Sequence, residues 1–112
     1  MTIAEIVEAL PAHVVHGEAG YRDLSIDRVI AGDLMSDILV SVEKDALLVT
    51  SLATEQSVRS ADILGIPIIL LVNDKLPPPE MKELARQCGI TLLATPMPMF
   101  ESCAALRALM PA

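Results

Sequence analysis

Apolar residues gather in four short runs along this chain, and each run breaks at a polar corner before a helical pattern. The runs lie within residues 26–37, which turn at Gly32 and Asp33, and in residues 46–50, 66–72 and 90–94. Strands that alternate with helices in this way are typical of a parallel sheet covered by helices. We therefore predict an α/β domain of two or three layers with a mainly parallel sheet of four to five strands.

The segments between these runs carry apolar residues at helical spacing. Thr2, with Glu5 three residues later, predicts a capping box at the start of an N-terminal helix that Pro11 closes. In the helix after Gly32, the pattern Met35, Ile38, Leu39 and Val42 is apolar, and Asp33 or Ser36 is expected to cap it. Further helices are expected to start at Thr54 and Pro79, to end at Gly65 and Gly89, and to span about 99–109.

Residues 13–29 predict a β-hairpin next to the N-terminal helix. Residues 13–16 are a short strand candidate, and the turn at 17–20 has two glycines that can take positive φ. The chain would then return antiparallel through residues 21–29. His13 and His16 would face opposite sides of a strand, which is unsuited to a pair of metal ligands.

Composition limits the classes of protein to consider. A chain of 112 residues is long enough for one domain with one core, so we treat 1–112 as a single unit. Aromatic residues make up only 2%, and the net charge is -7. Few stacking platforms and an acidic surface make nucleic acid an unfavourable partner.

Mean hydropathy is high, at +0.53, but no run reaches the roughly 20 apolar residues of a spanning helix. The N-terminus has Glu5 and Glu8 where a signal peptide would be apolar, so we expect a cytoplasmic protein without membrane contact. The surplus of apolar residues indicates a surface that meets another copy or a partner. Cys88 and Cys103 lie on apolar helix faces and are expected to be reduced, small hydrophobic residues.

Polar residues follow the predicted parallel strands at the edge where open α/β sheets bind ligands. Several of them are also ordinary capping residues, and Lys75 is the only cation, so nearby acidic groups would weaken anion binding. The candidate ligand-binding residues are Gly32, Asp33, Ser36, Asp37, Thr50, Ser51, Asn73, Lys75 and Thr95.

No phosphate-binding loop, dinucleotide fingerprint, nucleophile elbow or zinc-protease motif occurs in the sequence. We could assemble no positioned acid, base or nucleophile from the remaining residues. The expectation is a protein that is not an enzyme, with no cofactor and no metal.

Three segments suggest a family. Residues 32–39 (GDLMSDIL), 45–50 (DALLVT) and 89–96 (GITLLATP) resemble DRTGG domains, and the similarity extends from Thr2 to about Leu109. Such domains occur alone, beside CBS domains in pyrophosphatases, and beside ATPase-like and phosphotransacetylase regions. They also look like the N-terminal, non-catalytic domain of HPr kinase/phosphorylase. The resemblance implies a small α/β regulatory or interaction module that is often dimeric.

The sequence departs from the family at the motif that gives it its name. The Asp-Arg-Thr-Gly-Gly run is missing, and residues 71–74 (LVND) stand where the Thr-Gly-Gly would follow the central strand. Without the two glycines, we expect this corner to lose the backbone freedom that a close approach to an anion needs.

Together these observations predict a non-enzymatic, homodimeric regulatory or protein-interaction module, with a metabolic or redox enzyme as a possible partner. The alternative is a sensor domain that binds a nucleotide or a phosphorylated metabolite at the carboxyl edge of the strands.

Overall fold

The computed structural model describes residues 1–40 and 45–111. Five strands form one sheet in the order β1-β5-β4-β3-β2. Neighbouring strands from β2 to β5 are parallel, and β1 is antiparallel to β5. The strands are β1 (His13–His16), β2 (Val29–Ala31), β3 (Leu47–Thr50), β4 (Ile68–Leu71) and β5 (Thr91–Ala94).

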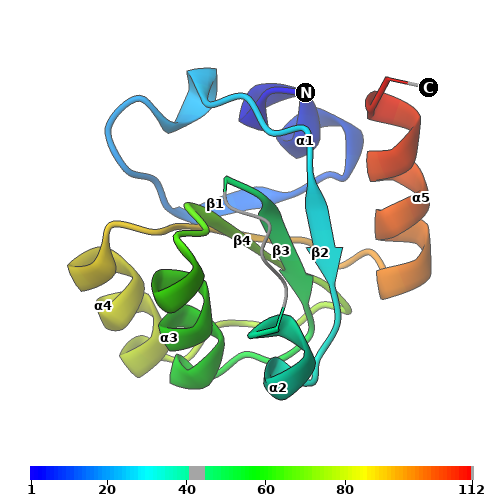
Figure 1. The fold of residues 1–112 in the computed structure, drawn as a ribbon. Coiled ribbons are helices and arrows are strands. Elements are labelled where there is room, and N and C mark those ends of the chain that lie inside the picture. Colours follow the sequence, from blue (N-terminus) through cyan, green and yellow to red (C-terminus); the bar gives the residue numbers. More distant parts are fainter. Residues whose placement is uncertain (41–44, 112) are drawn as a thin grey trace.

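The helices cover both faces of this sheet, so the predicted α/β fold is confirmed as three layers (Figure 1). One face carries α2 (Met35–Ile38), α3 (Glu55–Leu64) and α4 (Pro79–Cys88). The other face carries α1 (Ile3–Ala9) and α5 (Met99–Leu109). No helix in the described ranges is long and apolar enough to cross a membrane.

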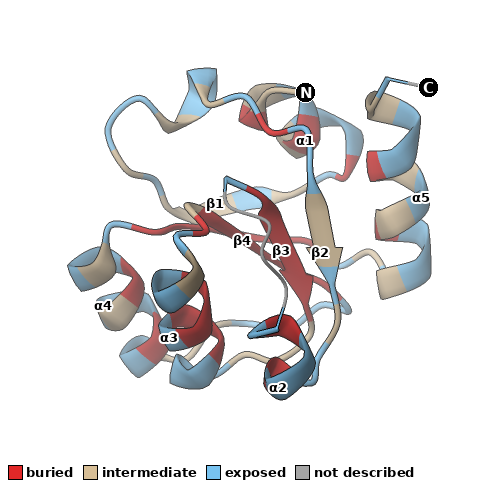
Figure 2. Cartoon of the chain, in the orientation of Figure 1, coloured by how far each residue is buried: buried red, intermediate tan, exposed pale blue. Residues whose placement is uncertain are grey.

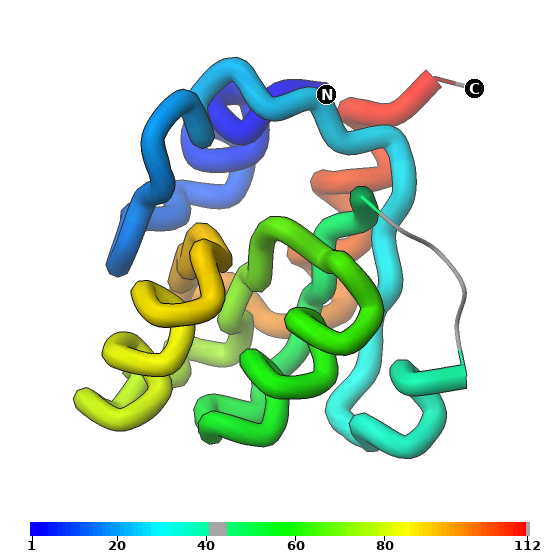
Figure 3. The backbone as a smooth tube through the Cα atoms, turned by 60° about the vertical axis from the view of Figure 1, so that its left-hand side comes forward, coloured from blue at the N-terminus to red at the C-terminus, as the bar shows by residue number. Residues whose placement is uncertain are grey.

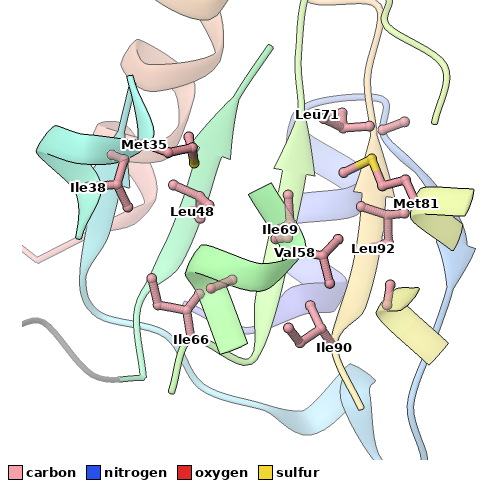
Figure 4. Packing of buried hydrophobic residues seen from close by; sticks show 13 residues of the cluster. Met35, Ile38, Leu48, Val58, Ile66, Ile69, Leu71, Met81, Ile90 and Leu92 are labelled. Carbon is pink, nitrogen blue, oxygen red and sulfur yellow. The ribbon is translucent and has the colours of Figure 1, made fainter. Parts of the chain in front are cut away.

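Each face of the sheet has its own aliphatic core. Figure 4 shows the first core, where Leu48, Ile69 and Leu92 from the strands meet Val58 and Met81 from the helices. In Figure 2 β3 and β4 are buried along their length, and all four residues of each strand are buried. Central parallel strands have both faces covered, so a nearly continuous apolar run is the sequence that fits there.

The predicted hairpin is wrong. β1 pairs with β5, with His13 opposite Ala94, whereas β2 lies at the far edge of the sheet. Between them residues 21–23 form a short 3₁₀ helix instead of a returning strand. Turn residues at 17–20 are compatible with a hairpin, but an isolated two-stranded hairpin is only marginally stable. Pairing with the buried strand β5 instead makes β1 part of the five-stranded sheet.

The helix ends agree with the sequence in most places. Thr2 and Glu5 form the predicted capping box, and Gly65 and Gly89 end their helices at φ of 73° and 70°. Thr54 is the N-cap residue of α3, but its side chain makes no capping hydrogen bond. The predicted anchor Val42 lies outside the described residues. Figure 3 shows both termini at the end of the molecule opposite α2.

Neither predicted cap of α2 is used. The N-cap residue is Leu34, which makes no side-chain capping hydrogen bond, and the helix spans only four residues. Asp33 therefore lies one position too early to cap, and Ser36 lies inside the helix. The carboxylate of Asp33 has other partners, which belong to the edge of the sheet.

Candidate functional site

Asp33 connects the carboxyl ends of β2 and β3. Its Oδ1 accepts the Ser51 backbone N–H at 2.6 Å and the Thr50 hydroxyl at 3.0 Å, and its Oδ2 accepts the Ser51 hydroxyl at 2.5 Å. Parallel strands bring their ends to the same edge, which is why these residues meet although 17 positions separate Asp33 from Thr50. The prediction that Asp33, Thr50 and Ser51 gather at one edge is thus confirmed.

Opposing effects act on the pKa of Asp33. Partial burial raises the pKa and is the largest single effect, but the hydrogen bonds from Ser51 and Thr50 and the nearby charge of Lys75 together outweigh it. The net result is a pKa below the ordinary value for an aspartate. Asp33 is therefore a carboxylate at neutral pH and occupies the donors that an external anion would need.

The corners after β3 and β5 have the same internal bonding. Thr50 accepts the N–H of Leu52, and Ser57 donates to the Leu52 carbonyl. In the second corner the Thr95 hydroxyl accepts the Met97 N–H, and Ser102 donates to the Met97 carbonyl. The shared pattern is a Thr followed by Ser seven positions later, a residue-level repeat that hydrophobic periodicity does not reveal.

Thr95 serves the fold rather than an open site. It is 1% exposed, and its hydroxyl donates to the carbonyl of Leu10, at the end of α1, at 2.5 Å. A buried hydroxyl needs such a partner, because an unsatisfied one would be costly. Thr95 therefore secures α1 to the edge of the sheet. Although it was predicted to bind a ligand, it has no accessible polar side-chain group.

Asn73 and Asp74 keep the backbone that two glycines would provide. Their φ angles are 62° and 59°, and the Lys75 N–H donates to the Val72 carbonyl to close a tight turn. Asn and Asp tolerate this left-handed conformation better than other residues with a side chain. The corner therefore adopts the left-handed conformation without the two glycines.

The amides of this turn are nevertheless occupied. Asn73 and Asp74 donate their N–H groups to the carbonyls of Met97 and Thr95. The Asn73 side chain accepts the N–H of Met99 at 3.0 Å, which caps the first turn of α5 from the neighbouring strand. Both groups hold corners together, so they form no open cradle for an anion.

The other predicted residues are at the same edge but do not converge. Ser36 and Asp37 are exposed on α2, and a Cβ added at Gly32 would stand 3.5 Å from Ile38, an ordinary contact. Lys75 is exposed and acts on Asp33 through its charge. Within the described parts of the chain, no group of three or more His, Cys, Asp or Glu could hold a metal ion.

Two grooves lie beside α5, away from the predicted residues. The larger, of about 410 Å³, is lined by Val29, Cys103, Leu106, Arg107 and Met110. The smaller, of about 280 Å³, is lined by Glu5, Glu8, Ala9 and Leu109. Sequence reasoning missed both, because each depends on α5 packing against a segment from the first third of the chain.

Comparison with known families matches the DRTGG domain over residues 5–109. The chain belongs to the DRTGG domain family. The match covers nearly the whole chain, although the name-giving run is absent. The resemblance stated from residues 32–39, 45–50 and 89–96 is thus confirmed. No curated protein sequence matches the chain.

One similar solved structure contains the CBS and DRTGG domains of the regulatory region of the Clostridium perfringens pyrophosphatase, in complex with its activator diadenosine tetraphosphate. The TM-score is 0.81 at 14% identity. The alignment covers 98% of this DRTGG domain and 47% of the other chain, so the domain spans about half of that structure. At this identity the comparison shows a common fold.

Proposed function

We propose that this DRTGG domain is a regulatory module that acts by binding a protein, has no catalytic activity of its own and works as a homodimer. Its partner would be a metabolic or redox enzyme in the cytoplasm. The domain of the C. perfringens pyrophosphatase belongs to a regulatory region, which supports a regulatory role here.

The observation that carries this proposal is how the polar edge of the sheet is used. Asp33, Thr50 and Ser51 bond to one another, and Asn73 and Thr95 bond to α5 and α1. The polar groups of this edge are used to hold the corners together, while several large apolar side chains are exposed. These side chains are Leu34, Leu39, Val40, Ile63, Leu76 and Phe100. Exposed apolar area favours contact with another macromolecule.

Light scattering behind a sizing column tests the homodimer. We expect twice the chain mass of 12.0 kDa at micromolar concentration. Copurification with a tagged chain from its native host, followed by mass spectrometry, would then identify the enzyme partner. A monomer over the whole concentration range would contradict the homodimer.

A second candidate function is a sensor for a nucleotide or a phosphorylated metabolite at the carboxyl edge of the strands. Lys75 supports it, because its positive charge acts on Asp33, the carboxylate that occupies the Ser51 and Thr50 donors. The similar pyrophosphatase region was solved with a dinucleotide activator. Such a ligand would have to displace the Asp33 carboxylate from these donors.

A thermal-shift panel of nucleotides and sugar phosphates distinguishes the two candidates, because a ligand that binds only the folded state raises the unfolding temperature. We expect Lys75→Ala to abolish any shift, and Lys82→Ala, which removes an exposed lysine from α4, to leave it unchanged. A panel without any shift would reject the sensor and leave the interaction module standing.

A further inference from the structure

Three large apolar side chains are exposed at the carboxyl edge of the sheet. Leu34 follows β2 and is 62% exposed, Leu76 follows β4 and is 73% exposed, and Phe100, in the first turn of α5, is 78% exposed. Because β2 to β5 are parallel, these three corners lie at the same end of the molecule (Figure 1). Single exposed apolar residues are ordinary, whereas a group of them at one edge marks an interaction surface.

The corners that carry these side chains are fixed by contacts between strands. Asp33 accepts three hydrogen bonds from the corner after β3, and the charge of Lys75 acts on the same carboxylate. Asn73 accepts the N–H of Met99, which joins the corner after β4 to the start of α5. Three consecutive prolines at 77–79 fix the backbone that follows. Preorganised side chains lose less conformational entropy on binding, so this edge suits contact with another protein.

The charge of this edge indicates what kind of surface fits it. The helices that start here each carry an exposed acidic residue in the first turn, namely Asp37, Glu55, Glu80 and Glu101. Such carboxylates stabilise the helix through its dipole, but they also give the edge a negative potential. In the described loops from β2, β3, β4 and β5 to these helices, the only basic residue is Lys75. A basic protein surface is therefore complementary to this edge.

We propose that the carboxyl edge binds the partner protein of this regulatory module, at a surface of that partner with an apolar pocket surrounded by lysine and arginine side chains. The three apolar side chains enter the pocket, and the first-turn carboxylates face its basic rim. Apolar anchors at the centre of an interface carry most of the binding energy, whereas rim charges mainly raise the association rate. A two-fold contact between copies would oppose acidic residues to each other, so the proposed homodimer uses a different surface.

This inference rests on the proposed protein-binding function and names its surface. Phe100→Ala and Leu76→Ala each remove one apolar anchor. Ile63→Ala is the matched control, because Ile63 is also 73% exposed but lies at the end of α3, on the opposite edge of the sheet. Glu101→Gln removes one rim charge, and its control is Glu8→Gln, an exposed residue of α1 at the far end of the molecule (Figure 3).

The experiment uses the full chain and its purified partner. Copurification with the tagged natural chain from its native host identifies that partner, which is then the probe in biolayer interferometry. We expect the dissociation constant to rise about tenfold or more for Phe100→Ala and Leu76→Ala and to stay unchanged for Ile63→Ala. Glu101→Gln should slow association and reduce its dependence on salt, whereas Glu8→Gln should change neither.

Circular dichroism checks that the variants fold, and if Phe100→Ala does not, Leu76→Ala decides. Equal affinities for the natural chain and the folded apolar variants overturn this surface and leave the protein-binding function standing. A bait that copurifies no protein overturns both. Two further results also overturn the proposal. One is loss of the dimer in Phe100→Ala by light scattering, which would assign the edge to a second copy, and the other is sedimentation of the natural chain with phosphatidylserine vesicles, which would assign it to a membrane.

Discussion

The carboxylate of Asp33 accepts both the backbone N–H and the hydroxyl of Ser51, at 2.6 and 2.5 Å. This pair joins the end of β2 to the corner after β3, on the edge where DRTGG domains and other open α/β sheets expose their strand ends. Asp33, which the sequence suggested as a helix cap or a ligand-binding residue, instead connects two strands.

Asp33→Ala should lower the free energy of unfolding by about 1–2 kcal/mol, because three hydrogen bonds to one carboxylate are lost but water screens the exposed group. Urea denaturation at pH 7 measures the change. Asp37→Ala, an exposed acidic residue of α2, is the control and should change stability by less than about 0.5 kcal/mol. Equal effects of both variants would contradict the role given to Asp33.

Acid should remove the stabilisation that Asp33 provides. Its pKa is lower in the folded chain than in the unfolded one, so the contribution is complete above the unfolded value of about 3.9 and disappears as pH falls through the folded value. The stability difference between the natural chain and Asp33→Ala is therefore expected to be constant near neutrality and to shrink below about pH 4. Denaturation of both proteins across pH 2 to 7 measures this stability difference. A difference that grows in acid would contradict the prediction.

At position 74, substitution by glycine should destabilise the fold less than substitution by alanine. Its φ of 59° is left-handed, a conformation that costs a residue with a Cβ about 1 kcal/mol and glycine almost nothing. Asp74→Gly is expected to be more stable than Asp74→Ala by about this amount in thermal unfolding. Asp62, inside α3, is the control, and there the order of the two variants should reverse because glycine weakens helices.

Ile69 should be the costlier of two isoleucines to truncate. It is fully buried in the core shown in Figure 4, so Ile69→Ala is expected to lose about 2–5 kcal/mol through lost burial and a cavity. Ile63 on α3 is 73% exposed, and Ile63→Ala should cost less than about 0.5 kcal/mol. Chemical denaturation measures both, and similar losses would argue against the described packing.

The two cysteines should react slowly with thiol reagents in the folded chain. Burial raises the pKa of Cys103, and burial followed by the charge of Asp62 raises the pKa of Cys88. Less thiolate is then present at a given pH, and thiolate is the reactive form. Alkylation followed by mass spectrometry at pH 8 should be slower for both thiols in buffer than in denaturant. Equal rates in the two conditions would contradict their half-buried positions.

Hydrophobic periodicity predicted most elements of this domain close to their observed bounds. The final helix spans Met99–Leu109 as expected, and the helix that ends at Gly89 begins at Pro79. These features depend on residues within one or two turns of each other, through caps, left-handed glycines and alternating burial. The candidate residues were likewise placed at one edge, because parallel strands end together.

Only the tertiary structure decided what those residues do there. The sequence determined that Asp33 follows a strand, but its bond to Ser51 depends on β2 and β3 being neighbours. In the same way, β1 could have paired with β2 by its turn residues, and the burial of β5 selected a different partner. Local patterns define strands and helices because their interactions are local, whereas strand order and the partner of each polar side chain depend on contacts between residues far apart in sequence.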